Sequence, residues 1–574
     1  MRRTPKKKST SFEVLFLFGM MFAFGQPIAF RSVVILYQLC YNLFSEIDFM
    51  EDYYMFNIIP QPTTMKIQDG KKGFCPDNAS ITDISVASEL VGFVKKISGK
   101  DIAVSDNGKE NIILKTDDNF SSDEGYTIAC ADGIITVTAK NETGIFYAMQ
   151  TLKQIFMQSG AEIPTFEIED YPRFSYRGYL LDCGRYFYTV EEVKRVVDLM
   201  ALHKLNILHW HLTEDQGWRV EIKKYPLLTQ KASKRSHTNF GIIPHGGFYT
   251  QDDIREIVNY CHERQIKVYP EFDIPGHSVA AISVYPYLSC FDRNLKVATH
   301  WGVKHDILCA GKETTYQFVY DILDELMELF PDKVIHIGGD EAVKMRWKLC
   351  PLCRKVIKEN GLKDEDELQM YFMTKVDAYL RSKGYSSIMW NYDTKGSTDN
   401  LDPAIMWNVC GLQENNELIK HEISRGRKLI NTQNSFYYLD FPYGWTSIEK
   451  ICNDDGALTD NDEETLGVEA CMWTEYVPNM KRLEFLTFPR LGAMAENAWA
   501  KKGYPDYSTF LGKADDYYKL LDVYNVQYAP MSKAMPSKLY KNASSLWFNR
   551  RVFHWQGLHN LIDDAMVERL AKKK

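Results

Sequence analysis

The strongest constraint on the fold is a repeated order of apolar strand, loop and helix that begins after Tyr171-Pro172. Parallel strands need long crossover connections, and helices usually supply them. About eight such strands in roughly three hundred residues predict an α/β fold, a closed (β/α)8 TIM barrel, rather than an open doubly wound sheet. No G-x-G-x-x-G turn follows a strand, which counts against a dinucleotide-binding fold. The predicted strands cover residues 178–182, 206–211, 267–272, 333–337, 387–390, 404–407, 428–431 and 468–473.

Helix signals lie between several of these strands. Thr189-Val-Glu-Glu192 is a capping box that predicts a helix through Met200. Thr250 precedes an apolar repeat with helical spacing that ends at Cys261. Both helices are therefore predicted to cover the barrel.

The chain of 574 residues is too long for one ordinary core, so a second domain is expected. Residues 55–168 contain short β-branched runs, a hairpin signal at Asp132-Gly133 and a segment from Thr143 that is typical of a helix packed on these strands. We expect a smaller α+β accessory domain there and the barrel over residues 170–525. The tail 531–574 receives no assignment.

Residues 1–50 resemble an export signal or a membrane anchor. Met1 to Lys8 is strongly basic, and an apolar run begins at Val14, which is the order of a secretory signal. No clean small-x-small cleavage site follows, so a retained anchor stays open. Gln26-Pro27 interrupts the apolar run before it could span a bilayer comfortably. We expect an exported protein: periplasmic, envelope-anchored or secreted.

The charge and the cysteine content narrow the classes of function that the chain can have. A net charge of -8 without a broad basic face argues against nucleic-acid binding. The 12 cysteines are scattered, and Cys350-Pro-Leu-Cys353 is a C-x-x-C without a second pair to complete a zinc site. A local disulfide, or two thiols in a loop, is favoured over a metal or redox role. No metal and no cofactor are expected.

Active sites of such barrels lie at the carboxyl ends of the strands. Polar and aromatic residues gather at the predicted strand ends, as expected for a site that binds a sugar ring with flat apolar faces and a rim of hydroxyls. They form the runs Arg177 to Asp182, His209-Trp-His211-Leu-Thr-Glu214-Asp215-Gln-Gly-Trp218, Glu271-Phe-Asp273-Ile-Pro-Gly-His277, His336-Ile-Gly-Gly-Asp340-Glu341, Trp390, Trp407, Tyr437-Tyr438-Leu-Asp440 and Trp473-Thr-Glu475.

Each member of this set also has an ordinary explanation. A pair such as Asp340-Glu341 is usually solvated or lies at a helix N-terminus. His209 and His211 could be satisfied core residues or a metal pair, and a single Trp is more often core than ligand platform. Only the combined order indicates a site.

That order resembles glycoside hydrolase family 20, the β-N-acetylhexosaminidases, from about Ile58 to Trp499. The motifs are Arg-Gly-x-x-x-Asp at Arg177, His-Trp-His-Leu-Thr-Glu-Asp-Gln-Gly-Trp, Glu-Phe-Asp-Ile-Pro-Gly-His and above all His-Ile-Gly-Gly-Asp-Glu. The segment before Asp170 resembles the accessory domain of this family.

The resemblance implies catalytic roles for three residues. Glu341 would be the general acid and later the general base, with a pKa raised by burial and by nearby negative charge. Asp340 would orient the substrate's 2-acetamido group and stabilise positive charge as the acetamido oxygen attacks the anomeric carbon, because this family uses a nucleophile from the substrate. Tyr438 would hydrogen-bond the acetamido oxygen.

The resemblance also implies the surrounding contacts. Trp390, Trp407 and Trp473 would wall the N-acetyl pocket and exclude water. Arg177 and Glu475, with help from Asp440, would bind the outer hydroxyls of the sugar.

Glu214 and His277 would lie behind Glu341 and adjust its protonation. The family pattern has Asp at the position of Glu214, so the extra methylene moves this carboxylate by about one bond.

The implied function is an exo-acting β-N-acetylhexosaminidase that hydrolyses terminal β-linked GlcNAc or GalNAc with retention, through an oxazolinium intermediate. The partner would be a glycan with a terminal N-acetylated amino sugar; a membrane is involved only if the N-terminal segment is retained, and the oligomeric state is open. Alternatives are a lacto-N-biosidase, a 6-sulfo-GlcNAc hydrolase or a sugar-binding protein whose catalysis has decayed. A metal-dependent hydrolase using His209, His211 and Asp273 lacks a recognised ligand spacing.

Overall fold

The computed structural model describes residues 56–68, 73–392, 394–402, 404–411, 416–503, 506–537, 539–544, 546 and 567. The signal or anchor expected in residues 1–50 lies outside these residues, as does most of the tail beyond Leu546. Among the described helices, none combines the length and the apolar character that crossing a bilayer requires.

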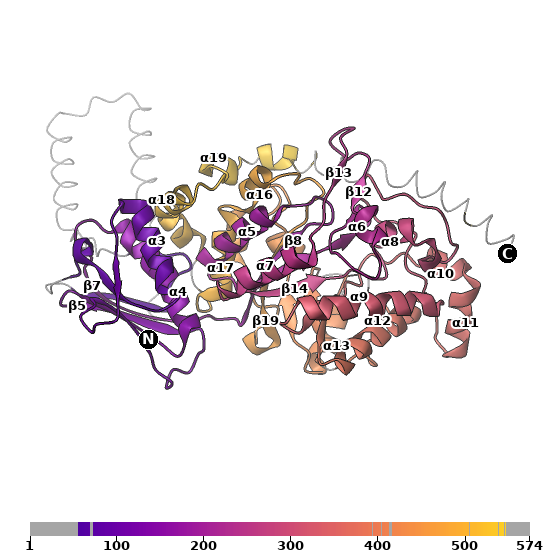
Figure 1. Ribbon diagram of the computed structural model, residues 1–574, viewed down its shortest axis with the longest axis horizontal. Coiled ribbons are helices and arrows are strands. Elements are labelled where there is room, and N and C mark those ends of the chain that lie inside the picture. Colours follow the sequence, from indigo (N-terminus) through magenta and orange to yellow (C-terminus); the bar gives the residue numbers. More distant parts are fainter. Residues whose placement is uncertain are drawn as a thin grey trace, which may run out of the picture. The chain divides into compact units, whose positions relative to one another are not determined.

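A seven-stranded sheet comes first in the chain. Its order is β1-β7-β5-β6-β4-β2-β3, and the helices α3 (Ala87–Ser98) and α4 (Glu142–Gln158) pack on it (Figure 1). Asp132 and Gly133 form the β5–β6 turn with φ values of 52° and 80°, so the expected hairpin is confirmed. The strands are β1 Thr64–Gln68, β2 Ser80–Thr82, β3 Ala103–Ser105, β4 Ile112–Thr116, β5 Tyr126–Ala131, β6 Ile134–Ala139 and β7 Thr165–Asp170.

A closed barrel of parallel strands follows, in the order β14-β15-β16-β17-β18-β19-β8-β9. All eight predicted strands are present, with ends displaced by up to three residues, and the predicted fold class is confirmed. The barrel strands are β8 Tyr176–Asp182, β9 Ile207–His211, β14 Lys267–Glu271, β15 Val334–His336, β16 Ser386–Trp390, β17 Met406–Val409, β18 Leu429–Asn431 and β19 Thr465–Met472.

Helices surround the barrel (Figure 1). Thr189 and Thr250 each form a complete capping box, at the starts of α5 and α7, so both predicted helix starts are confirmed. The helices are α5 Val190–Leu202, α6 Leu227–Gln230, α7 Gln251–His262, α8 Val279–Val284, α9 Glu313–Leu329, α10 Met345–Leu349, α11 Pro351–Glu359, α12 Glu365–Ser382, α13 Asn416–Ser424, α14 Asn434–Tyr437, α15 Ile448–Asn453, α16 Met480–Thr487, α17 Arg490–Trp499, α18 Tyr507–Val523 and α19 Met531–Ala534.

Short elements complete the described secondary structure. They are the 3-10 turns η1 Pro76–Asn78, η2 Pro286–Leu288 and η3 Asp462–Glu464 and the two-residue strands β10 Thr213–Glu214, β11 Gly217–Trp218, β12 Lys234–Arg235 and β13 His245–Gly246.

The barrel interior is layered. An apolar cluster that includes Tyr176 and Ile207 fills the end where the strands begin. A second cluster, with Trp390 and Trp473, fills the end where they finish. Between them lies a buried polar layer in which Glu469 accepts a hydrogen bond from Asn408 and lies beside His209. The buried polar layer therefore lies inside the barrel, directly beneath the aromatic cluster at the carboxyl ends of the strands.

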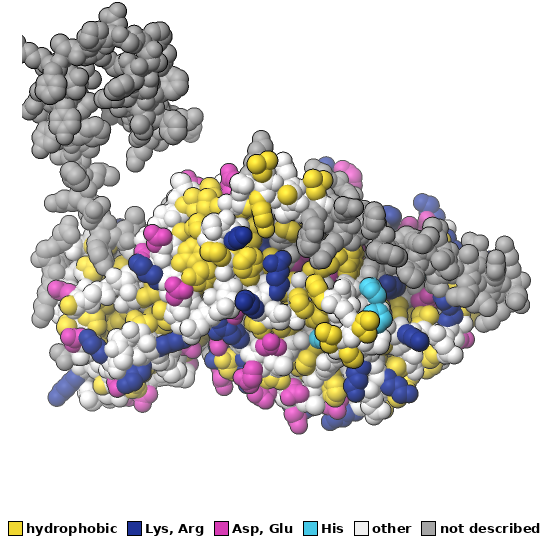
Figure 2. Space-filling model, turned by 90° about the horizontal axis from the view of Figure 1, so that it is seen from above, with side chains coloured by type: hydrophobic (Ala, Val, Ile, Leu, Met, Phe, Trp, Pro, Cys, Tyr) yellow, Lys and Arg dark blue, Asp and Glu magenta, His cyan; other side chains and the backbone are white. Residues whose placement is uncertain are grey.

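The sheet and the barrel share buried ionic contacts. Lys204, after α5, lies 2.8 Å from Asp170 at the end of β7, and both side chains are fully buried. Trp499 donates to the same carboxylate at 2.8 Å. On the surface, hydrophobic, basic and acidic side chains lie side by side over the face seen in Figure 2.

Candidate active site

Three loops at the carboxyl ends of β9, β14 and β15 bring the central acidic residues together. Glu214 follows β9, His277 follows β14, and the Asp340-Glu341 pair follows β15. His277 and Glu341 both have φ values of 47°, a left-handed conformation that is strained for such residues. Strain of this kind concentrates at functional sites, where the surrounding structure holds it in place.

Glu341 lies beside a histidine and a second carboxylate. Nε2 of His277 is 3.6 Å from Oε2 of Glu341 and 3.9 Å from Oδ2 of Asp340. Burial, together with the charge of Asp340, raises the pKa of Glu341 to about 7, against the opposing effect of His277. Burial also raises the pKa of Asp340. A carboxyl group with a pKa near 7 can hold a proton at neutral pH and release it, as acid catalysis requires.

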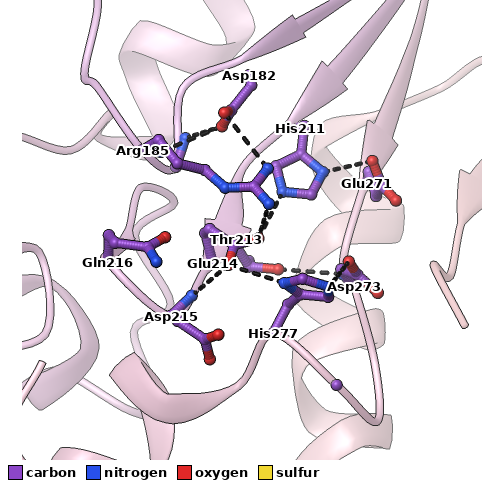
Figure 3. Close-up of polar contacts among 12 residues, drawn as sticks. Asp182, Arg185, His211, Thr213, Glu214, Asp215, Gln216, Glu271, Asp273 and His277 are labelled. Atoms are coloured by element: carbon purple, nitrogen blue, oxygen red, sulfur yellow. Dashed lines mark hydrogen bonds and ion pairs between the residues drawn. The ribbon is translucent and has the colours of Figure 1, made fainter. Parts of the chain in front are cut away.

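His277 is held by Glu214 (Figure 3). Its Nδ1 lies 2.8 Å from Oε1 of Glu214, and Oε2 of Glu214 lies 3.2 Å from Nη2 of Arg185. Burial disfavours a charged imidazole, but Glu214 and Asp273 outweigh it and keep the pKa of His277 well above its usual value. The longer Glu side chain, which departs from the family pattern, therefore still reaches the histidine.

Arg185 is a site residue that the sequence reasoning missed. Its guanidinium lies 3.4 Å from Asp182, 3.2 Å from Glu214 and 3.7 Å from Glu475, and 4.9 Å from the ring centre of Trp473. Asp182, at the end of β8, also accepts from the backbone N–H of Arg185 at 3.1 Å. The position of Arg185 just after the end of β8 was the available signal.

The prediction that Arg177 binds the sugar is wrong. Arg177 is the second residue of β8, so it lies at the amino end of the barrel, and its side chain is 1% exposed. It forms an ion pair with Glu124 of the sheet domain at 2.6 Å and donates to the Lys204 carbonyl at 2.7 Å. Only the carboxyl end of a barrel strand faces the active site.

Two of the three predicted tryptophans form an aromatic wall. Trp390 and Trp473 lie 5.7 Å apart between ring centres, and Tyr438 lies 6.2 Å from Trp473. Nε1 of Trp390 donates to Glu271 at 2.7 Å, which fixes the indole. Burial raises the pKa of Tyr438 well above its usual value, so its hydroxyl stays protonated and can donate.

Trp407 does not belong to this wall. In the β16–β17 register, Trp407 pairs with Met389 and Asn408 pairs with Trp390. Paired residues share a face of the sheet, so Trp407 points with Met389 toward the outer helices, where it joins the main core. The predicted strand was correct, but the side chain faces the opposite side.

Asp440 and Glu475 supply further carboxylates near the wall. Burial and the charge of Glu475 raise the pKa of Asp440 well above its usual value. Burial raises the pKa of Glu475 as well, although Arg185 opposes the shift. Among the described residues, Oδ1 of Asp340 and Oδ1 of Asp440 are buried without a hydrogen-bond partner, so both oxygens can accept from a ligand.

His209 and His211, which were considered with Asp273 for metal-dependent hydrolysis, belong to the buried polar layer together with His336. Nε2 of His209 lies 3.1 Å from Glu271, and Nδ1 of His336 lies 3.1 Å from the same residue. His211 also contacts Glu271 and lies 3.4 Å from Glu214. These donors could hold an ion, but a catalytic metal needs an open coordination position. Here the three imidazoles are nearly or fully buried.

The expectation that Cys350-x-x-Cys353 lacks further thiols is wrong. Cys290 and Cys309 lie beside it, and all four side chains are buried. Neither residue forms a second C-x-x-C, so spacing along the chain gave no sign of the cluster. The loops after β14 and β15 bring the thiols together.

Two family descriptions cover most of the described chain. "Glycosyl hydrolase family 20, domain 2" matches residues 55–171, and "Glycosyl hydrolase family 20, catalytic domain" matches residues 174–502. The two matched segments correspond to the seven-stranded sheet and to the barrel.

Similar proteins agree with this match. A β-hexosaminidase of Porphyromonas gingivalis is 34% identical over 82% of this chain, which spans 64% of that relative's length. A β-N-acetylhexosaminidase structure from Bacteroides fragilis has a TM-score of 0.71 and 30% identity, covering 84% of this chain and 99% of that one. An exo β-N-acetylglucosaminidase from Vibrio harveyi, solved with N-acetylglucosamine, has a TM-score of 0.73 and 27% identity, covering 83% and 78%. With both family domains matched in order, and with the barrel and acidic loops that its sequence motifs predicted, this chain belongs to glycosyl hydrolase family 20.

Proposed function

We propose that this protein is an exo-acting β-N-acetylhexosaminidase that removes terminal β-linked GlcNAc or GalNAc from glycans. The observation that carries the proposal is the Asp340-Glu341 pair: one carboxyl has a pKa of about 7, and its neighbour presents an unpartnered buried oxygen. The aromatic wall of Trp390, Trp473 and Tyr438 suits an acetamido group and sugar ring. The names of the related hexosaminidases support the same activity.

In the first step, the substrate's acetamido oxygen attacks the anomeric carbon while Glu341 protonates the departing glycosidic oxygen. The attack makes the acetamido nitrogen positive, and an ionised Asp340 stabilises that charge and aligns the group. Tyr438 donates a hydrogen bond to the acetamido oxygen. The bond to the leaving group breaks as the oxazolinium ring closes, so the protein supplies no nucleophile.

In the second step, Glu341 has lost its proton and acts as a base. It accepts a proton from a water molecule that attacks the anomeric carbon and opens the ring. Two inversions restore the original configuration, so the product is the β-anomer. Glu214 holds His277 beside Glu341, and His277 opposes the rise in the pKa of Glu341. The carboxyl can therefore donate a proton in the first step and accept one in the second.

Around the sugar ring, Arg185, Asp440 and Glu475 bind the outer hydroxyls. Hydrogen bonds to charged groups contribute about 1.5–3 kcal/mol each, so a few of them fix one orientation. Requiring the terminal hydroxyls restricts the enzyme to chain ends.

The test is hydrolysis of p-nitrophenyl β-N-acetylglucosaminide and of the plain β-glucoside, each with and without a thiazoline inhibitor that resembles the cyclised intermediate. We expect cleavage of the acetamido sugar only, and inhibition by the thiazoline. Cleavage of both sugars would contradict the acetamido mechanism. If folded protein cleaves neither sugar, assays with a 6-sulfated GlcNAc glycoside and a lacto-N-bioside follow, and failure of all of them leaves a sugar-binding protein.

We also propose an exported location, supported by the basic and then apolar N-terminal sequence. N-terminal sequencing of the protein from cell fractions tests both export and cleavage. Full-length protein in the cytosolic fraction would contradict the proposal.

A further inference from the structure

Four buried thiols lie together beside the active-site loops and take no part in the proposed reaction. Cys290, Cys309, Cys350 and Cys353 are 7%, 0%, 1% and 0% exposed. Their sulfur atoms all lie within 4.8 Å of one another. In the described part of the chain, no other cysteine belongs to such a group of possible metal ligands.

The spacing of the sulfur atoms is that of ligands around one ion. Sγ of Cys290 lies 3.9 Å from Sγ of Cys353, and Sγ of Cys309 lies 3.9 Å from Cys350 and 3.6 Å from Cys353. Zinc–sulfur bonds of about 2.3 Å in a tetrahedron place the sulfurs about 3.8 Å apart. A disulfide would instead hold one pair at about 2.05 Å.

The local backbone is arranged to present the thiols. Cys350 is the N-cap of α11 and Cys353 lies in the first turn of that helix, the C-x-x-C arrangement that structural zinc sites use. Backbone N–H groups at a helix start favour thiolates. Cys309 follows a loop whose Leu308 and Cys309 N–H groups bond to Pro275 and Leu288, so the third ligand is fixed as well.

We propose that Cys290, Cys309, Cys350 and Cys353 bind one structural Zn²⁺ ion through their thiolates. Four protein ligands close the coordination sphere and leave no position for substrate, which is the pattern of a structural rather than a catalytic site. Each thiol releases its proton on binding. The proposal concerns a second site and does not depend on the hydrolytic activity.

The ion would join two loops that carry active-site residues. Cys290 and Cys309 belong to the segment between β14 and α9, downstream of His277, while Cys350 and Cys353 follow Asp340-Glu341 after β15. Trp347 already donates to the Leu308 carbonyl across these segments at 2.9 Å. Zinc would reinforce this contact and hold His277 against the acidic pair.

The first experiment uses the full-length protein, purified without added chelator and exchanged into metal-free buffer. Inductively coupled plasma mass spectrometry should find about one zinc per chain. The protein is then unfolded with EDTA and iodoacetamide, without reductant, and its mass is measured. Zinc binding predicts that all four cysteines are alkylated, whereas two disulfides would leave them unmodified until reductant is added.

The second experiment compares Cys353→Ser with Cys261→Ser, a matched change at a buried cysteine of α7 outside the cluster. Cys353→Ser should lose most of the zinc, and Cys261→Ser should keep it. Wild-type chain refolded with Co²⁺ should show the visible absorption of a tetrahedral thiolate complex, which Cys353→Ser should lack.

Protein without zinc, whether its four thiols are free or paired as disulfides, overturns the proposal. So does iron in place of zinc, or equal zinc in the two variants. If Cys353→Ser does not fold, the metal content and thiol state of the unmodified chain decide the matter.

Discussion

At the residue scale, Glu341 is the group on which the proposed chemistry depends. Its side chain is 34% exposed, so substrate can reach it, and yet burial of the carboxyl raises its pKa to about 7. His277 and Asp340 act on that pKa in opposite directions. Glu341 is therefore accessible to substrate, while burial and the neighbouring His277 and Asp340 set its pKa.

Glu341→Gln should keep the fold but remove the proton donor. For a substrate with a poor leaving group we expect kcat to fall by about 10²–10⁴-fold, the usual contribution of general acid catalysis. A substrate with a good leaving group needs less protonation and should lose less in the first step. Steady-state rates on alkyl and nitrophenyl glycosides measure the difference.

Asp340→Asn is the matched control for that variant. It removes the charge that stabilises the intermediate, so good and poor leaving groups should suffer alike. Equal patterns in the two variants would show that the roles of the two carboxyls are wrongly assigned.

The pH dependence of kcat/KM should reflect the same pair. Glu341 must be protonated to act, and its pKa is raised to about 7, so activity should fall as pH rises through about 7. Asp340 must be ionised, and burial raises its pKa, so activity should also fall on the acid side at a pH above the usual range for Asp. In Glu341→Gln the alkaline limb should disappear; its persistence would assign that limb to another group.

Two arginines provide a direct comparison between binding and stability. Arg185→Ala should lower kcat/KM by about 10- to 100-fold, because each hydrogen bond to a charged group is worth about 1.5–3 kcal/mol. Arg177→Ala should lower the thermal midpoint and leave KM unchanged, since Arg177 pairs with Glu124 far from the sugar. A raised KM in Arg177→Ala would contradict this placement.

At the element scale, strands and helix starts were predictable because local patterns determine them. Thr189 and Thr250 cap their helices through contacts within four residues. All eight barrel strands could be recognised in the sequence as apolar runs. The motif from His336 to Glu341 likewise located the acidic loop.

The wrong predictions have a common cause. Each concerned a feature that tertiary structure determines and the local sequence does not. A shift of one residue along a strand changes the face, so Asn408 rather than Trp407 points inward. Arg177 lies near the start of β8 and Arg185 lies just after its end, so the position along the strand determines which arginine reaches the site. Cys290 is separated from Cys353 by 63 residues, so only the folded loops could bring these thiols together.

The loop after β15 contains a glycine at which any side chain would meet Asp273. Gly338 has a φ of 64°, and a Cβ there would lie 1.7 Å from Oδ1 of Asp273. Gly338→Ala should therefore displace Asp273 or the acidic loop and lower kcat by at least about 10²-fold, the usual cost of misplacing a catalytic group by about 1 Å.

Gly361→Ala is the control, because Gly361 has a similar φ of 63° with nothing within 4 Å of its Cβ. It should cost about 1–2 kcal/mol of stability from backbone strain and leave kcat unchanged. Rates and urea midpoints of both variants separate collision from strain. Equal rates in the two would mean that the loop tolerates the collision.

At the scale of the whole molecule, the sheet and the barrel share a buried charge. Asp170 of β7 pairs with Lys204 of the barrel and accepts from Trp499. Burial alone lowers the pKa of Lys204, and Asp170 opposes that shift. If the sheet and the barrel lost this contact, Asp170 or Lys204 would be left as an unpaired charge in an apolar environment.

Asp170→Ala should therefore destabilise the barrel although the substitution lies in the sheet. Breaking one partner of a buried ion pair costs about 3–5 kcal/mol, because the remaining charge is left uncompensated. Every tryptophan of the chain follows residue 200, so tryptophan fluorescence during urea unfolding reports on the part of the chain that follows the sheet. The control Asp101→Ala removes an exposed partner of Lys95 and should change stability by less than about 1 kcal/mol. An unchanged fluorescence midpoint in Asp170→Ala would mean that the barrel is stable independently of the sheet, and that the shared charge does not couple them.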